Sequence, residues 1–374
     1  MTVSDDRRHM ARALQLAERG LYSTDPNPRV GCVIVAAGEV VGEGWHERAG
    51  GPHAEVHALQ AAGAKALGAT AYVTLEPCSH HGRTPPCADA LIRAGIARVV
   101  VAMEDPNPQV AGGGLQRLRG AGIDVESGLM AAQAEALNPG FLKRMRTGRP
   151  FVRVKIAASL DGRTAMASGE SQWITGPEAR ADVQRLRARS SAIVTGIGTL
   201  LADRPALTVR ETEMGGLGDH ASPGRQPLRV VLDSRLRSPL DAPLFQQAGN
   251  SVVLTTRDSL QNHSVQAAAL SSAGVLVEAL GETEAVDLAA VLDWLGARGC
   301  NEVLVEAGPT LAGAFLSADL VDEFWLYQAP VLLGSEARPL VDLPIQQMAD
   351  RLRLRVLDRR MVGQDQRLVL GVGE

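Results

Sequence analysis

Apolar positions in the first part of the chain alternate between helical and extended spacing. Residues 6–19 carry apolar side chains at intervals of three and four and are followed by Gly20, which predicts an amphipathic helix with a glycine C-cap. Short β-rich or continuously apolar runs are typical of buried strands. Such runs occupy residues 30–36, 71–75 and 98–103, and further helices are expected at 53–62, 87–94 and 115–121. This alternation predicts a layered α/β domain.

A second series of the same kind follows a polar, turn-rich break at residues 147–150, which read TGRP. The sequence predicts a helix at 183–188 and strands at 151–157, 192–196, 229–232, 251–254, 302–305 and 324–329. A glycine-rich segment at 215–226 is expected to be irregular and mobile. We therefore predict two α/β domains, residues 1–147 and 148–374.

Composition limits the partners that the chain can have. Its 374 residues suit two or three domains, and 45% hydrophobic with 21% charged residues is ordinary for a globular protein. Lys and Arg number 38 against 42 Asp and Glu, so the net charge is −4, and aromatic residues make up 3%. A nucleic-acid partner is not expected, because the chain has neither a basic field nor many rings on which bases could stack.

The four cysteines are too few for a disulfide scaffold in a chain of this length. The first ten residues, MTVSDDRRHM, contain no apolar signal core, and no run of ~18 apolar residues indicates a membrane span. We expect a cytoplasmic protein with no membrane partner. Its cysteines are then core residues, metal ligands or nucleophiles.

The strongest chemical signal is a set of metal-binding residue types in the first domain. His53 and Glu55 are followed by Cys78, in the sequence Glu-Pro-Cys, and by Cys87. One imidazole and two thiolates suit tetrahedral zinc with an open fourth position for water, whose pKa the metal lowers towards ~7. Glu55 could carry a proton from that water to a leaving amine. A His-x-Glu sequence followed by Pro-Cys is the pattern of zinc deaminases.

The spacing of the cysteines departs from that general pattern. Eight residues, 79–86, separate Cys78 from Cys87, where the pattern has two. A structural zinc site closed by His80 or His81 therefore remains an alternative. Cys32 and Cys300 are expected to be ordinary core residues.

Long stretches of the sequence resemble one enzyme family. They read PNPRVGC at residues 26–32, GEGWHERAGGPHAE at 42–55, EPCSHHGRTPPC at 76–87, DPNP at 105–108 with GGG at 112–114, KIAASLDGRTAMASGESQWIT at 155–175 and EAGPTLAG at 306–313. They resemble the bifunctional deaminase-reductases of riboflavin biosynthesis, and the long loop between the cysteines matches this family. The resemblance covers nearly the whole chain.

For the first domain, the resemblance implies a cytidine-deaminase-like α/β/α fold that acts on a free nucleotide. The implied substrate, 2,5-diamino-6-(5-phosphoribosylamino)pyrimidin-4(3H)-one, loses its 2-amino group as ammonia. His53, Cys78 and Cys87 match the family's ligands to one zinc ion, and Glu55 matches its proton carrier. Asn27 and His46 match positions that contact the pyrimidine. Arg83 is a further candidate, as a partner of the ribose phosphate.

The residues of the second domain indicate a nucleotide site only weakly. No complete G-x-G-x-x-G follows a strand. A strand at 303–305 leads into a glycine turn and a helix start, whose backbone N–H groups could hold a diphosphate. Ser234 and Arg235 at another strand end suit the 2′-phosphate of NADP. Ordinary connecting turns are the alternative at both places.

The resemblance adds a dihydrofolate-reductase-like α/β fold for this domain. It implies that NADPH reduces the ribosyl group, by hydride delivery to C1′ of an open-chain imine, to give 5-amino-6-(5-phosphoribitylamino)uracil. The implied cofactor contacts are Ala157, Trp173, Thr199, Asp203, Ser234, Gly308, Pro309, Thr310, Leu311, Ala312, Gly313 and Ala314. The implied substrate contacts are Ser171, Arg187, Leu207, Arg210 and Glu306, and Lys155 is added because a buried lysine on a strand needs a reason. The family also suggests a homo-oligomer, a dimer or higher.

Two rival interpretations stay open on the sequence alone. The first is an RNA or nucleoside deaminase fused to an unrelated domain, against which the acidic charge balance argues. The second is a zinc-stabilised binding module without turnover.

Overall fold

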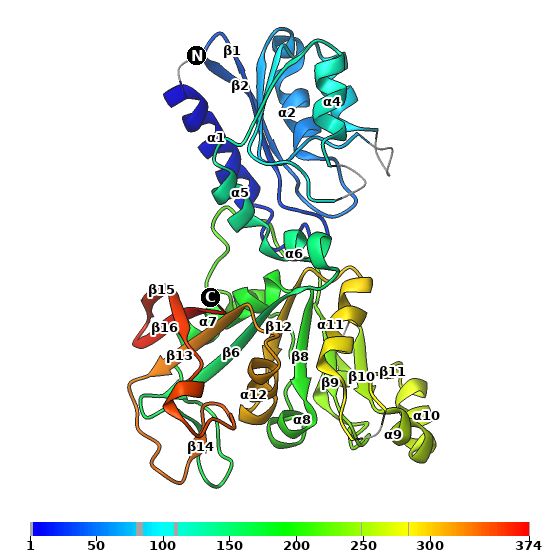
Figure 1. The fold of residues 1–374 in the computed structure, drawn as a ribbon, viewed down its shortest axis with the longest axis vertical. Coiled ribbons are helices and arrows are strands. Elements are labelled where there is room, and N and C mark those ends of the chain that lie inside the picture. Colours follow the sequence, from blue (N-terminus) through cyan, green and yellow to red (C-terminus); the bar gives the residue numbers. More distant parts are fainter. Residues whose placement is uncertain (1–2, 80–84, 108–110, 248, 283, 374) are drawn as a thin grey trace. The chain divides into compact units, whose positions relative to one another are not determined.

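The computed structural model describes residues 3–79, 85–107, 111–247, 249–282 and 284–373. The chain forms two compact units (Figure 1): unit 1 consists of Met1–Gly148 and Leu217–Gly224, and unit 2 consists of Arg149–Gly216 and Arg225–Glu374. Part of the irregular segment expected at 215–226 thus groups with unit 1. Within that unit Ala221 N donates to Arg19 O, at 2.8 Å, and His220 Nδ1 donates to Glu18 O, also at 2.8 Å.

Unit 1 contains a five-stranded sheet in the order β2-β1-β3-β4-β5, in which β3, β4 and β5 are parallel and β1 is antiparallel to both of its neighbours. Its elements are α1 (Val3–Glu18), β1 (Gly31–Ala36), β2 (Glu39–Trp45), α2 (Ala54–Ala62), the 3-10 helix η1 (Gly63–Ala66), β3 (Thr70–Val73), α3 (Cys87–Arg93), β4 (Arg98–Val101), α4 (Gly113–Gly120), β5 (Asp124–Ser127), α5 (Ala131–Leu137) and α6 (Pro139–Thr147).

Helices cover both faces of this sheet, as the layered α/β prediction requires. Ala54, Ala58 and Leu118, from α2 and α4, share one apolar cluster with residues of β1, β3 and β4. Met10 of α1 and Phe141 of α6 belong to a second cluster, which includes the opposite side of the same strands. Because successive side chains of a strand point to opposite faces of the sheet, each of these strands contributes residues to both apolar clusters.

Helix α2 lies unusually close to strand β2, and two glycines make this possible. A Cβ on Gly42 would stand 2.2 Å from Ala58 O, and a Cβ on Gly44 would stand 2.5 Å from Ala54 O. The small side chains of α2 and the glycines of β2 therefore bring the two backbones together. This contact holds the first turn of α2 against β2, and α2 begins next to His53.

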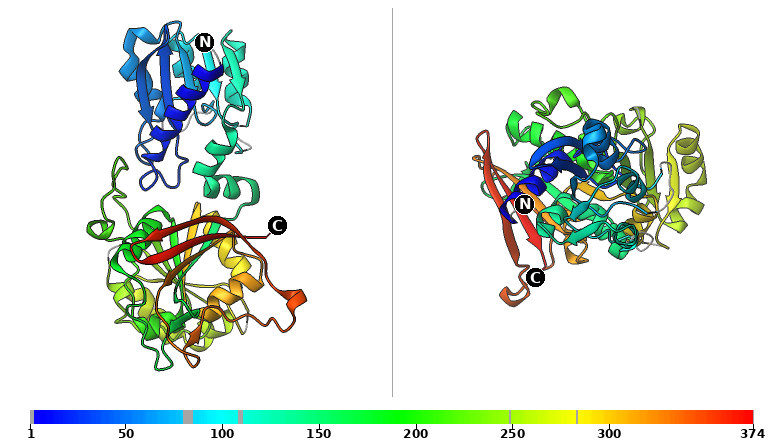
Figure 2. Two further views of the ribbon diagram at one scale, coloured as in Figure 1. Left: turned by 90° about the vertical axis from the view of Figure 1, so that its left-hand side faces the viewer. Right: turned by 90° about the horizontal axis from the view of Figure 1, so that it is seen from above.

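Unit 2 is built on a nine-stranded sheet in the order β11-β10-β9-β8-β12-β6-β13-β16-β15. The strands from β11 to β13 run parallel, and β16 and β15 are antiparallel additions at one edge (Figure 2). Its strands are β6 (Phe151–Ser159), β7 (Arg163–Ala165), β8 (Ala192–Gly196), β9 (Leu228–Leu232), β10 (Ser251–Thr255), β11 (Leu276–Ala279), β12 (Glu302–Glu306), β13 (Glu323–Ala329), β14 (Arg338–Pro339), β15 (Leu354–Val362) and β16 (Asp365–Val372).

Helices also cover both faces of the second sheet. Val291 of α11 and Phe315 of α12 share the largest apolar cluster with alternate residues of the central strands. Leu186 of α7, Leu200 of α8 and other residues form the cluster on the opposite face. The helices of unit 2 are α7 (Pro177–Arg189), α8 (Ile197–Asp203), α9 (Arg257–Asn262), α10 (Ser264–Ser272), α11 (Leu288–Ala297) and α12 (Pro309–Ser317), with 3-10 turns η2 (Glu211–Glu213), η3 (Pro243–Gln246) and η4 (Met348–Asp350).

Each strand and helix that the sequence predicts has a counterpart in the structure, but several elements were not predicted. The most extensive omission is the hairpin of β15 and β16, which Figure 1 draws in red. Strand β15 reads LRVLDRRMV and is exposed along most of its length. It therefore lacks the apolar alternation on which a strand prediction depends.

Within the part of the chain that the structure describes, every helix is too short or too polar to span a bilayer.

A partly buried ion pair joins α1 to the sheet of unit 1. Asp6 accepts hydrogen bonds from Arg98 Nη1 and Nη2, at 3.0 and 2.9 Å, and another from the Tyr72 hydroxyl. The Arg98 hydrogen bonds, assisted by Tyr72, hold the pKa of Asp6 below its usual value of 3.8 although burial opposes this. The ionised carboxylate therefore stabilises the folded state.

We predict that Asp6→Asn lowers the free energy of unfolding by about 1–3 kcal/mol at pH 7, because a charged acceptor is lost from a partly buried network. The folded-state pKa is lowered, so this contribution is complete above the ordinary pKa and disappears as the pH falls through the lowered value. Urea unfolding at pH 7 and below pH 4 measures both effects. Asp124→Asn, at an exposed partner of the same arginine, is the control. Equal losses from the two variants would contradict the prediction.

Candidate functional site

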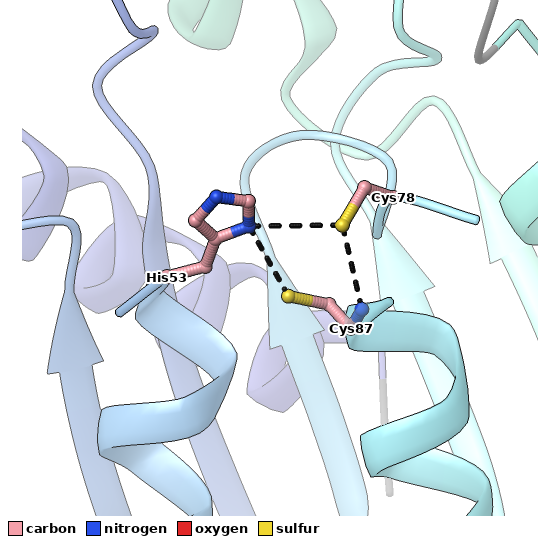
Figure 3. Close-up of side chains that lie close together, drawn as sticks. All are labelled: His53, Cys78 and Cys87. Carbon is pink, nitrogen blue, oxygen red and sulfur yellow. Dashed lines mark hydrogen bonds between the residues drawn. The ribbon is translucent and has the colours of Figure 1, made fainter. Parts of the chain in front are cut away.

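The structure brings His53, Cys78 and Cys87 together at one point of unit 1 (Figure 3). One ligand atom from each residue lies within 4.8 Å of the others. His53 Nδ1 is 3.7 Å from Cys78 Sγ and 3.3 Å from Cys87 Sγ, and the Cys87 backbone N–H donates to Cys78 Sγ at 3.4 Å. An imidazole and two thiols converging in this way fit the donor set of zinc.

Two of these three side chains lie at the starts of helices. His53 is the N-cap of α2 with an extended backbone, φ −77° and ψ 165°, so the helix begins one residue later than predicted. Two residues within one helix that are two positions apart point to nearly opposite faces. Because His53 lies outside α2, this does not apply to His53 and Glu55. Cys87 is the first residue of α3, and Cys78 follows β3.

The electrostatics of the trio favour a thiolate. Hydrogen bonds from Cys87 and His53 lower the pKa of Cys78 to about 4 against the effect of burial. The same interaction with Cys78, together with burial, raises the pKa of Cys87. A thiol that gives up its proton easily is prepared for a cation, and the cation would draw the second proton off as well.

Glu55 lies in the first turn of α2 with 3% of its surface exposed. Burial raises the pKa of its carboxyl group, although His53 opposes the shift. A carboxyl group with a raised pKa beside a candidate metal site suits proton transfer.

The two expected pyrimidine contacts, Asn27 and His46, lie side by side next to the trio. Asn27 Nδ2 donates to His46 Nε2, and His46 Nδ1 donates to Pro52 O, both at 3.0 Å. The His46 ring meets the His53 ring edge-on, with centroids 5.4 Å apart. Burial lowers the pKa of His46, which favours the neutral ring, and these two bonds orient it.

Three candidates from the loop between the cysteines cannot be placed. His80 and His81, the alternative fourth ligands, and Arg83, the expected phosphate partner, lie outside the described residues.

In unit 2 the structure joins three of the expected substrate contacts. Arg187 donates from Nε and Nη2 to the two carboxylate oxygens of Glu306, at 2.6 and 2.9 Å, and from Nη1 to Thr208 O at 3.1 Å. Lys155 on β6 stands opposite Glu306 on β12. Burial lowers the pKa of Lys155. Burial alone would raise the pKa of Glu306, but the charge and hydrogen bonds of Arg187 hold it below its usual value.

The expected diphosphate turn is a helix start. Gly308 is the N-cap of α12, no side chain caps the helix, and Gly308 N donates to Thr199 Oγ1 at 3.1 Å. The first turn is Pro309, Thr310 and Leu311, and Ala314 follows in the next. Ala312 and Gly313 are buried within the helix. A Cβ on Gly313 would stand 1.9 Å from Asp342 O, so packing within the protein already requires this glycine.

The other expected contacts are more scattered. Ser171 Oγ donates to Asp203 Oδ1 at 3.0 Å, which joins a predicted substrate contact to a predicted cofactor contact. Trp173 is 67% exposed and lies against Arg180. Val286 N donates to Ser234 Oγ at 3.1 Å, which leaves the hydroxyl proton to donate elsewhere.

The remaining three candidates differ in exposure. Ala157 is partly buried on β6, Leu207 is buried with φ +50°, and Arg210 is exposed and paired with Glu213 at 2.8 Å.

Two acidic residues that were not singled out from the sequence hold loops in place in the structure. Glu76 accepts four backbone hydrogen bonds two residues before Cys78. Asp161, just beyond β6, accepts backbone N–H groups from Leu333 and Gly334 and so ties two loops together. A signal existed for Glu76 alone, since its acidic side chain adjoins the Pro-Cys pair and a glycine triplet lies further along the chain.

Two family models match the chain. The cytidine and deoxycytidylate deaminase zinc-binding region matches residues 3–103, and the RibD C-terminal domain matches residues 150–367. The second model alone covers more than half of the chain.

Full-length relatives are similar to the whole chain. Riboflavin biosynthesis protein RibD of Escherichia coli (strain K12) is 56% identical over 96% of this chain and 97% of its own length. The RibD protein of Haemophilus influenzae is 48% identical over 98% and 97%.

Solved structures agree with these relatives. Acinetobacter baumannii RibD, form 1, is 48% identical with a TM-score of 0.90 and full coverage of both chains. A diaminohydroxyphosphoribosylaminopyrimidine deaminase/5-amino-6-(5-phosphoribosylamino)uracil reductase of Thermotoga maritima is 31% identical, with a TM-score of 0.85 over 99% of both chains.

We predict that Cys87→Ala removes the metal from unit 1, because only two of the three donors remain. Metal analysis after gel filtration in a chelator should find about one zinc per parent chain and almost none in the variant. Cys300→Ala, at a buried cysteine of unit 2, should keep its zinc. Zinc retained by the Cys87 variant would exclude this residue as a ligand.

Proposed function

This chain belongs to the riboflavin biosynthesis protein RibD family, and from that premise we propose the reaction of each unit and the residues that carry it. The chain is a bifunctional deaminase and reductase, with a zinc-binding deaminase domain followed by a RibD reductase domain. This excludes the rival of a deaminase fused to an unrelated domain. The geometric observation that carries the proposal is the meeting of His53, Cys78 and Cys87 beside the buried Glu55.

We assign to unit 1 the deamination of 2,5-diamino-6-(5-phosphoribosylamino)pyrimidin-4(3H)-one. When bound by His53, Cys78 and Cys87, zinc supplies a water molecule activated for attack on the carbon bearing the 2-amino group. Glu55 takes a proton from that water and passes it to the departing ammonia. Burial supports this role, because a carboxyl group removed from water holds a proton more firmly than an exposed one.

Asn27 then orients the pyrimidine. Its amide nitrogen is engaged by the neutral His46 ring, so its amide oxygen remains to accept a hydrogen bond from the substrate. His46 acts by fixing Asn27, since Pro52 and Asn27 occupy both of its ring nitrogens.

Unit 2 is assigned the reduction of the ribosyl group to ribityl. NADPH supplies the hydride when it is bound, and the uncapped start of α12, with Thr199 and Ser234, suits its phosphates. Trp173, Asp203 and Ala157 complete the proposed cofactor contacts. Arg235 at the exposed strand end is a further partner for a 2′-phosphate.

We assign different roles to the proposed substrate residues of unit 2. Each of the three guanidinium nitrogens of Arg187 already donates to Glu306 or to Thr208 O, so we assign Arg187 to holding Glu306 in place. The exposed Arg210 is then the better partner for the substrate phosphate. Lys155, Ser171 and Leu207 line the same proposed site, and Lys155 offers a positive charge next to Glu306.

We predict that substitutions in the two units separate the two activities. Glu55→Gln should lower ammonia release by about 10²–10⁴-fold, since proton transfer is lost, while zinc stays bound. Its oxidation of NADPH with the deaminated nucleotide should match the parent. Arg187→Lys keeps the charge but loses the bidentate pair with Glu306. This variant should release ammonia like the parent and should oxidise NADPH more slowly with the deaminated nucleotide.

Assays with and without NADPH test the order of the reactions. Ammonia should appear from the diaminopyrimidinone nucleotide without NADPH, and absorbance loss of NADPH should follow only after deamination. Consumption of NADPH by the undeaminated substrate would contradict the order. Bound zinc with neither reaction would favour the rival of a binding module without turnover.

A homo-oligomer and a cytoplasmic location remain predictions. Strand β15 supports the first, because it ends the nine-stranded sheet and exposes Val356 by 61% and Met361 by 62%. The unpaired backbone groups of an edge strand are a template for pairing with another copy.

We expect Val356→Arg together with Met361→Arg to shift the protein towards monomers in sedimentation experiments, because paired edges would bring these charges together. Val265→Arg, at a residue of α10 that is 84% exposed, is the control. An unchanged mass in the double variant would remove β15 from the interface.

A further inference from the structure

Glu76 is a buried carboxylate held entirely by backbone groups of a distant segment. Only 4% of the residue is exposed. Oε1 accepts from Gly114 N and Leu115 N, at 2.8 and 3.2 Å, and Oε2 accepts from Asp105 N and Gly112 N, at 3.1 and 3.0 Å. All four donors lie between the end of β4 and the first turn of α4.

This arrangement satisfies two requirements at once. A buried carboxylate needs donors for its oxygens, and the first N–H groups of a helix need acceptors. Gly114 and Leu115 belong to the first turn of α4, whose positive end also favours an anion. The carboxylate therefore fastens the start of α4 to the chain just before Cys78.

The same segment touches both neighbours of Cys78. A Cβ on Gly114 would stand 2.0 Å from Pro77 O, and a Cβ on Gly113 would stand 2.9 Å from Ser79 Oγ. The glycines at 113 and 114 thus let the segment lie directly against Pro77 and Ser79. The Glu76 backbone is held too, since its N–H donates to Met103 O at 3.0 Å.

We propose that Glu76 is a positioning residue for the zinc ligand Cys78, acting through the start of α4. Its four hydrogen bonds set the path of residues 76–79 and so hold the Cys78 sulfur in front of His53 and Cys87. This inference rests on the zinc role proposed for the trio. Glu76 itself does not reach the metal or the substrate.

The test compares Glu76→Gln with the parent in the full-length protein. Glutamine has one carboxamide oxygen and turns an NH₂ group towards two N–H donors, so the start of α4 and the Cys78 loop should separate. Competition with a chelator should show zinc binding weakened by about 10- to 100-fold, as when groups that orient metal ligands are lost. Glu104→Gln, at an exposed glutamate just before the same segment, should bind zinc like the parent.

Cobalt(II) gives a readout that a merely structural role would not change. With zinc replaced by cobalt, the thiolate-to-cobalt absorption of Glu76→Gln should weaken or shift, because the Cys78 sulfur is displaced. Parent-like zinc affinity and cobalt absorption in this variant would overturn the proposal, even if its melting temperature fell. A parent protein that bound no zinc would contradict the proposed function, which is a different result from a parent and a Glu76 variant that bind zinc equally well.

A second variant keeps the proposal testable should Glu76→Gln not fold. Gly114→Ala leaves the carboxylate in place but pushes on Pro77 O, so it should weaken zinc binding and alter the cobalt spectrum in the same direction. Gly120→Ala, at the other end of α4 with open space around it, is its control. Oxidation of NADPH with the deaminated nucleotide should be unchanged in all four variants. Zinc binding by Gly114→Ala equal to that by Gly120→Ala would overturn the proposal.

Discussion

A charge that leaves water must find a partner, and this constraint organises both units of the protein. In unit 1 the Glu76 carboxylate is covered by four backbone N–H groups. In unit 2 Arg153 is buried between Glu302 and Glu323, and Arg187 between Glu306 and the Thr208 carbonyl. Each of these contacts joins segments far apart in the sequence, so meeting the constraint also places residues of the proposed sites.

The charged pairs explain how α7 packs on its sheet. This helix is mostly polar, yet it buries Asp182, which accepts hydrogen bonds from Tyr327 and Arg367 at 2.7 Å each. Nearer the C-terminal end of the same helix, Arg187 pairs with Glu306 and Arg189 pairs with Glu302, both on β12. The helix is therefore held over the sheet by ion pairs as well as by Leu186, and one of those pairs is part of the proposed substrate site.

Small residues have the complementary role of letting backbones approach each other. Gly42 and Gly44 admit α2 against β2, Gly114 admits α4 against Pro77, and Gly313 admits Asp342 against α12. At each of these places a helix start or a ligand-bearing loop lies near the contact. The sites thus depend on where side chains are missing as much as on where they are present.

The sequence by itself determined the alternation of strands and helices and singled out the three side chains that converge in unit 1, because the first depends on local periodicity and the second on residue types with few other roles. It could not determine that His53 lies just outside its helix, that Arg187 is occupied by Glu306, or that Glu76 holds the start of α4. Those facts depend on which distant groups meet, and a charged residue looks the same in sequence whether it faces water or a buried partner. The exposed β15 escaped prediction for a related reason, since its place is set by pairing with β16 and its own side chains bury little.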